Sequence, residues 1–179
     1  MIKSKFTIIT FYQFKKIDDI INIKNELVHF CKFNKIKGTI ILAEEGINGT
    51  IAGLFESIKK FESHLLSLGF SCYNPKYSYS KFMPFFRLKV RNKKEIVTLR
   101  SKDVDPENIT GKKIRPKDWN NLISDKETIL IDVRNNFEVE MGTFKDSINP
   151  NTKNFTDFKS YVKNNLREAK NKKIAIFCT

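Results

Sequence analysis

Short β-branched and aromatic runs alternate with amphipathic stretches through the first hundred residues, and this alternation constrains the fold more than any other feature. Residues 6–14 (FTIITFYQF) are typical of a β-strand, because such side chains pack well on a pleated surface. After Asp18, apolar residues recur every three or four positions, which is the period of a helix with one buried face. The next predicted elements are strands at 37–43 and 50–52, a turn at 44–49 with the hairpin signal Asn48-Gly49, and a helix at 57–68 that Gly69 ends.

Strand-like sequence then returns at residues 87–91 and 95–99. The order becomes strand, helix, strand, strand, helix, strand. This order predicts the split βαβ pattern of a ferredoxin-like domain over residues 1–100.

The second half of the chain has a different pattern. Residues 101–111 are polar and contain a Pro and a Gly, which predicts a linker. Beyond them we predict a short helix at 116–123, strands at 128–133 and 173–178, and a helix at 155–166. We therefore expect an α/β protein, with an incomplete α/β domain at 112–179, since two parallel strands do not complete a sheet of this kind.

Positive charge is concentrated in the first domain. The chain has 33 Lys and Arg against 20 Asp and Glu, a net charge of +13. Residues 1–100 hold 18 of these cations and 8 of the acids, and residues 63–94 hold no acid at all. Lysine-rich composition from an AT-rich genome is one explanation, but it does not account for the difference between the halves. A polyanionic partner of the first domain is the other explanation.

Other classes of protein are disfavoured by what the sequence lacks. No apolar run approaches the roughly 20 residues of a membrane span, and no signal peptide begins the chain. The three Cys, at positions 31, 72 and 178, form neither a disulfide framework nor a CxxC metal pair. We expect a cytoplasmic protein without a metal site and without a membrane partner.

Two groups of residues could carry chemistry in the second domain. Cys178 follows a predicted strand, where open α/β sheets bind their ligands, although a Cys is commonly a small buried apolar residue. Asp132, Arg134 and Glu138 follow the other strand and could hold one another in a fixed loop, either around a site or as a purely structural ion-pair network. Position alone leaves these alternatives open.

A third group lies in the basic domain. On a strand, Arg87, Lys89 and Arg91 would share one face, and a row of cations on a sheet can bind RNA phosphates. The neighbouring aromatic residues are predicted to belong to the core; they are Tyr77, Tyr79, Phe82, Phe85 and Phe86.

Several motifs together resemble one family, the rhodanese-like tRNA uridine hydroxylases. The longest is residues 38–53 (GTIILAEEGINGTIAG), and Pro84–Val90, Glu95–Leu99 and Ile131–Asn135 follow it in order. Gly142-Thr-Phe144, Asn149–Thr152 and Phe177-Cys-Thr179 also fit the family pattern.

The resemblance implies an acylphosphatase-like domain followed by a rhodanese domain, and 5-hydroxylation of the wobble uridine of tRNA with molecular oxygen as co-substrate. Any further cofactor is unknown. Cys178 and Thr179 match the first two positions of the rhodanese loop, so Cys178 inherits the role of catalytic residue, with Asp132, Arg134 and Glu138 as support. The sequence ends inside this motif, and we expect the 179-residue chain by itself to be inactive.

Two alternatives stay open beside hydroxylation. The first is a sulfurtransferase that carries a persulfide on Cys178. The second is a non-catalytic RNA-binding remnant.

Overall fold

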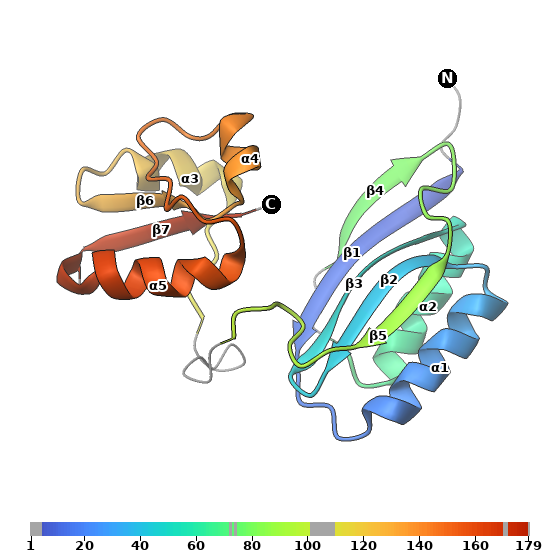
Figure 1. The fold of residues 1–179 in the computed structure, drawn as a ribbon. Helices are drawn as coiled ribbons and strands as arrows, with labels where there is room; N and C mark the ends of the chain where they lie inside the picture. Colours follow the sequence, from blue (N-terminus) through green and yellow to red (C-terminus); the bar gives the residue numbers. More distant parts are fainter. Residues whose placement is uncertain (1–4, 72, 74, 101–109, 170–171, 179) are drawn as a thin grey trace. The chain divides into compact units, whose positions relative to one another are not determined.

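The structure, a computed structural model, describes residues 5–71, 73, 75–100, 110–169 and 172–178 (Figure 1). It divides into two compact units, Met1–Val97 and Thr98–Thr179. The predicted linker, residues 101–111, lies outside the described residues except for its last two positions.

The first unit is a five-stranded sheet with two helices. Its elements are β1 (Phe6–Phe14), α1 (Ile20–Phe33), β2 (Lys37–Ala43), β3 (Gly46–Gly53), α2 (Phe55–Ser67), β4 (Lys76–Ser80) and β5 (Leu88–Asn92). The strand order is β4-β1-β3-β2-β5, antiparallel throughout except for the parallel pair β2 and β5. The first four strands of that order form the ferredoxin-like arrangement, so the predicted fold class is confirmed for this unit.

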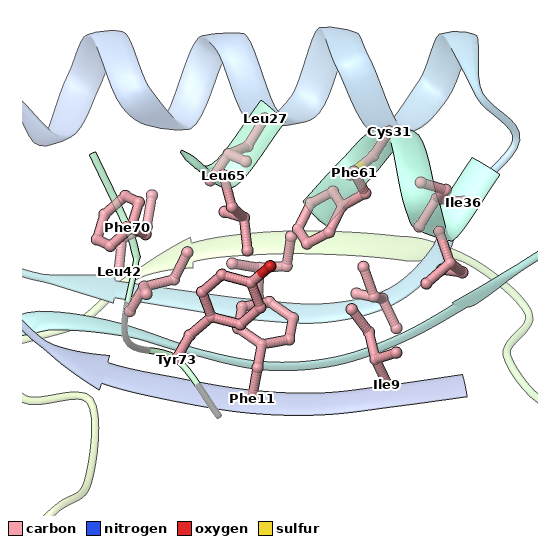
Figure 2. Close-up of a cluster of buried hydrophobic side chains, with 14 of the residues drawn as sticks. Ile9, Phe11, Leu27, Cys31, Ile36, Leu42, Phe61, Leu65, Phe70 and Tyr73 are labelled. Atoms are coloured by element: carbon pink, nitrogen blue, oxygen red, sulfur yellow. The ribbon is translucent and has the colours of Figure 1, made fainter. Parts of the chain in front are cut away.

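Both helices cover the same face of the sheet, and the core lies between the two layers (Figures 1 and 2). Ile9 and Phe11 of β1 point into it, and Leu27 of α1 and Phe61 of α2 close it from the other side. The Phe11 and Phe61 rings lie 5.6 Å apart. Burying a side chain of this size stabilises the fold by about 1.5–3 kcal/mol. The spacing of the apolar residues in the sequence therefore determines which face of each helix packs against the sheet.

The turn between β2 and β3 lies earlier than predicted. It comprises Glu44 and Glu45, and Asn48-Gly49 lies inside β3 instead of forming the hairpin turn. Packing explains the difference. A Cβ at Gly49 would lie 2.9 Å from the Phe11 ring, so the glycine is required by a close approach and not by a turn.

The fourth strand of the ferredoxin-like pattern was also predicted wrongly. It is β4, in residues 76–80, which pairs with β1 at one edge of the sheet. The predicted strand at 87–91 is β5, a fifth strand beside β2 at the opposite edge. Residues 95–99 form no strand, and the backbone N–H of Ile96 instead donates to the Glu45 carboxylate at 2.7 Å.

The second unit contains a two-stranded parallel sheet with short helices. Its elements are α3 (Pro116–Ile123), β6 (Thr128–Asp132), α4 (Asn136–Glu140), α5 (Phe155–Asn165), the 3-10 helix η1 (Arg167–Ala169) and β7 (Lys173–Phe177). β6 pairs with β7, in the register Asp132 to Phe177. Leu130 and Ile131 of β6 are buried, whereas Ile174 and Ile176 of β7 are exposed.

Across the described residues, no helix combines the length and the apolar character that crossing a bilayer requires. The same residues contain no group of three or more His, Cys, Asp or Glu side chains arranged to hold a metal ion.

Candidate functional site

The parallel pairing of β6 and β7 brings two predicted site residues to the same edge of the sheet. Asp132 is the last residue of β6, and Cys178 directly follows β7. Because the carboxyl ends of parallel strands meet, Cys178 lies beside the loop that follows β6. The backbone N–H of Val133 donates to the Phe177 carbonyl at 3.1 Å and fixes the register at this edge.

Asp132 and Arg134 form a buried ion pair that shapes the loop after β6. The Asp132 carboxylate is inaccessible to solvent, and the Arg134 Nη2 donates to its Oδ2 at 2.6 Å. Arg134 Nε donates to the same carboxylate at 2.9 and 3.2 Å, and Thr143 Oγ1 donates to it at 2.7 Å. The guanidinium also reaches across the loop to the Gly142 carbonyl at 2.7 Å. A guanidinium that is held by an ion pair and several hydrogen bonds is fixed in one orientation.

The electrostatics of this pair follow from its contacts. Burial alone would raise the pKa of the Asp132 carboxyl, but the hydrogen bonds from Arg134 and Thr143 outweigh burial and hold the pKa below its ordinary value. The hydrogen bond to Asp132 in turn raises the pKa of Arg134. The Asp132 carboxylate is therefore ionised, and its hydrogen bonds position the Arg134 guanidinium.

A pocket of about 440 Å³ opens beside this ion pair. It is lined by Arg134, Gly142, Thr143, Phe144, Phe177 and Cys178. The Cys178 side chain is exposed, and the Arg134 guanidinium lies over the Phe177 ring at 5.6 Å. A thiol and a fixed cation in one pocket can hold an anionic group next to the sulfur.

Glu138, the third predicted supporting residue, has a local role. Its carboxylate accepts from the Asn135 backbone N–H at 3.2 Å and from the Asn135 side chain at 3.1 Å, completing the capping box of α4. Glu138 is not among the residues that line the pocket. These two hydrogen bonds stabilise the first turn of α4.

Sequence reasoning missed Thr143 and Gly142 as parts of this site. Gly142 lies eight and Thr143 nine residues after Arg134, and no local pattern predicts that their loop folds back onto Asp132. The only signal was the match of Gly142-Thr-Phe144 to the family motifs.

Cys31 is not part of this pocket. Cys31 is fully buried in the core of the first unit, and burial raises its pKa to about 12. Its thiol is therefore un-ionised at neutral pH. Cys72 lies outside the described residues.

The predicted RNA-binding residues lie on and next to β5. Leu88 and Val90 pack against the core, so Lys89 and Arg91 face the other way, toward the side of the sheet without helices. Arg87 lies in the bend just before β5, and it lines a pocket of about 480 Å³ with Lys89, Phe85 and Phe86 among others.

The prediction that the neighbouring aromatic residues belong to the core is wrong: four of the five are exposed, and the half-buried Phe85 is not part of the core cluster. Tyr77, Tyr79, Phe82 and Phe86 are exposed, Phe86 by 99%. Tyr77 lies on the helix side of the sheet, where its hydroxyl donates to Glu62 of α2.

Comparison with solved structures finds distant similarity. Full-length HypF in its phosphate- and nucleotide-bound form matches at 10% identity with a TM-score of 0.35, over 50% of this chain and 12% of the HypF chain. An acylphosphatase from Coxiella burnetii matches at 12% identity with a TM-score of 0.34, over 51% of this chain and all of the acylphosphatase.

The family comparison covers a continuous segment. Residues 6–96 match the UPF0176 acylphosphatase-like domain. This segment is just over half of the chain and contains all seven elements of the first unit. The chain therefore belongs to the UPF0176 family, whose acylphosphatase-like domain forms its first unit.

Proposed function

We propose that the protein modifies tRNA, by oxygen-dependent 5-hydroxylation of the wobble uridine, with Cys178 as the catalytic residue. Membership of the UPF0176 family supports a role connected with tRNA. The motifs that resemble the tRNA uridine hydroxylases support the reaction. The observation that carries the proposal is the pocket in which the exposed Cys178 and the fixed Arg134 guanidinium meet.

In this proposal the residues of the pocket have separate roles. Cys178 contacts the reacting base, and Arg134 holds an anionic or carbonyl group of the nucleotide beside the sulfur. Asp132 positions Arg134, and Thr143 holds the Asp132 carboxylate in place by donating a hydrogen bond to it. The exposed Phe144 contributes an apolar wall against which a base can lie.

The experiment is a nucleoside analysis of tRNA from a strain that lacks the gene, with mass spectrometry as the measurement. We expect 5-hydroxyuridine and its derivatives to disappear and to return when the complete gene is restored. A gene carrying Cys178→Ser should not restore them, whereas the matched control Cys31→Ala should, since Cys31 lies in the core of the other unit.

Two outcomes would replace the proposal. Loss of a thiolated nucleoside instead of a hydroxylated one would favour a sulfurtransferase with a persulfide on Cys178. An unchanged nucleoside profile would favour a non-catalytic RNA-binding protein.

A further inference from the structure

The two faces of the first unit's sheet differ in what covers them. α1 and α2 lie on one face, and among the described residues of the first unit no helix lies on the other (Figure 1). We call this second surface the open face; it comprises the side chains of the five strands that point away from the core. Solvent reaches this face, because the hydroxyls of Thr10 and Thr50 form an exposed hydrogen bond there at 3.0 Å.

Strand register aligns one residue from each strand in a row across the open face. Thr10 pairs with Lys76 on one side and with Thr50 on the other. Thr50 pairs with Thr39, which pairs with Lys89. The row therefore begins and ends with a lysine and carries three hydroxyls between them. Four strand spacings make it about 19 Å long, which suits an extended polymer better than a small molecule.

The charge of the open face has a single sign. Its strand residues include Lys37, Lys76, Lys89 and Arg91 and no Asp or Glu, because all eight acids of the first hundred residues lie in helices, turns or connecting segments. Among the described residues, none of these four cations forms an ion pair with a carboxylate. On the helix side, by contrast, Lys59 of α2 is paired with Glu62 at 2.9 Å.

Aromatic rings accompany the cations. Tyr12 is 42% exposed and lies next to the row, packed edge-on against Phe14 at 6.3 Å. At the β5 edge, Phe86 and Phe85 line a pocket together with Lys89 of the row. Exposed rings beside unpaired cations are the arrangement with which sheet surfaces stack unpaired bases and bind the phosphates between them.

We propose that the open face binds single-stranded RNA, with the nucleotides lying across the strands from Lys76 to Lys89 and a base stacked on Tyr12. This inference rests on the proposed function in naming RNA as the polymer, and it specifies that the unpaired part of the tRNA is what the first unit holds. A duplex would offer only its phosphates to this surface, since its bases are stacked within the helix.

The experiment measures binding of a fluorescently labelled 12-nucleotide oligouridine to the 179-residue chain by anisotropy, over a series of salt concentrations. The variant Lys76→Glu/Lys89→Glu should weaken binding at least tenfold and reduce the slope of log K against log salt by about 1.4, or 0.7 for each phosphate that is no longer neutralised. The matched control is Lys24→Glu/Lys60→Glu, which makes the same charge change on α1 and α2. It should weaken binding much less.

Two further variants separate a true site from loss of folding or of net charge. Thr10→Lys adds a cation to the row beside Lys76 and should tighten binding, whereas Ser63→Lys on α2 should not. Tyr12→Leu should weaken binding of the single strand about tenfold and leave binding of a 12-base-pair duplex unchanged, because the variant removes the stacking ring and keeps the charge.

The inference is overturned if both double variants weaken binding equally, if Thr10→Lys has no effect, or if the duplex binds as tightly as the single strand. Its failure is distinct from failure of the proposed function. If tRNA loses 5-hydroxyuridine in the deletion strain but the open-face variants bind normally, only this inference falls. If the open face binds RNA but no tRNA nucleoside changes, only the proposed hydroxylation falls.

Discussion

Asp132 is the residue on which the candidate site depends most. It has no solvent exposure, and its partner Arg134 retains only 17% of its side-chain surface. Replacing Asp132 by Asn leaves the guanidinium without its counter-charge in a semi-buried position. We expect Asp132→Asn to lower the free energy of unfolding of the second unit by about 3 kcal/mol, because breaking a buried pair leaves the remaining charge uncompensated. Trp119, the one tryptophan of the chain, packs on Phe177 and reports this transition by fluorescence during urea unfolding.

The same unit offers a matched control. Arg115 and Asp118 form an ion pair at 3.0 Å in which both side chains are substantially exposed. Exposed pairs contribute little, so Asp118→Asn should change the free energy of unfolding by less than about 0.5 kcal/mol. Equal effects of the two substitutions would contradict a special role of Asp132.

The Asp132 pair also predicts a pH dependence. The folded-state pKa of the carboxyl lies below its unfolded value of about 3.9, so its stabilising contribution is complete above about pH 4 and is lost as the pH falls through the folded-state pKa. The stability difference between the wild-type chain and Asp132→Asn should therefore be constant from pH 7 to 5 and shrink in more acidic solution. Urea unfolding followed by Trp119 fluorescence at several pH values measures it, and a difference that grows with acid would refute the assignment.

The cysteines should differ in reactivity. Cys31 is fully buried with a pKa raised to about 12, whereas Cys178 is exposed. At pH 8 we expect iodoacetamide to modify Cys178 in the folded chain and to modify Cys31 only after urea is added, because the Cys31 thiol is neither accessible nor ionised. Peptide mapping by mass spectrometry separates these sites from Cys72. Rapid labelling of Cys31 without denaturant would contradict its place in the core.

At the scale of single elements, the pairing of β2 with β3 depends on Gly38. Its φ of +132° is unfavourable for other residues, and a Cβ there would lie 2.3 Å from the Thr50 carbonyl oxygen. We expect Gly38→Ala to destabilise the first unit by at least about 2 kcal/mol, through backbone strain and displacement of the neighbouring strand. Faster amide hydrogen exchange in peptides from α1 and α2 would show this destabilisation locally.

Gly111 provides the comparison for this prediction. A Cβ at Gly111 meets no atom within 4 Å, and its backbone is not in the left-handed region. Gly111→Ala should leave the exchange of α1 and α2 unchanged. A normal exchange pattern in Gly38→Ala would show that β2 and β3 tolerate the added methyl group.

The elements that could be predicted from the sequence are those whose own residues determine them. β1, β2 and α3 have the predicted bounds, because apolar periodicity and the helix-starting Pro116 are local signals. β4 was missed because its residues, KYSYS, are all at least partly exposed and carry no core pattern. Only its pairing with β1 makes it a strand. Asn48-Gly49 misled the prediction for a related reason, since what selects Gly49 is the Phe11 ring on another strand.

In the candidate site, too, some features follow from local sequence and others depend on contacts between residues distant in the sequence. The positions of Asp132 and Cys178 at strand ends follow from sequence and parallel pairing. The short helix α4 and the return of Thr143 onto Asp132 depend on contacts across eleven residues, which no local pattern contains. The hydroxyl row of the open face is likewise visible only in the strand register.

At the scale of the whole molecule, the uneven charge predicts where tRNA binds. Replacing Arg87, Lys89 and Arg91 by Ala should weaken tRNA binding and reduce its salt slope by roughly one unit for each phosphate that is no longer neutralised. The matched control removes three exposed lysines of the second unit, Lys112, Lys117 and Lys126. Filter binding at several salt concentrations distinguishes the two variants. If both variants weaken binding equally, the net charge of +13 acts as a diffuse attraction and not through the first unit.

The strand order of the first unit also determines when it can form during synthesis. β1, which is synthesised first, is an interior strand of the sheet and pairs with β3 and with β4, whose residue Ser80 lies opposite Phe6. At a ribosomal rate of about 5–20 residues per second, β1 therefore waits several seconds with one edge unpaired. β2 waits similarly for β5, since Gly38 pairs with Leu88. A nascent chain stalled before residue 76 would consequently expose two unsatisfied strand edges, and it would be a better substrate for ribosome-associated chaperones than one stalled after β5 has emerged.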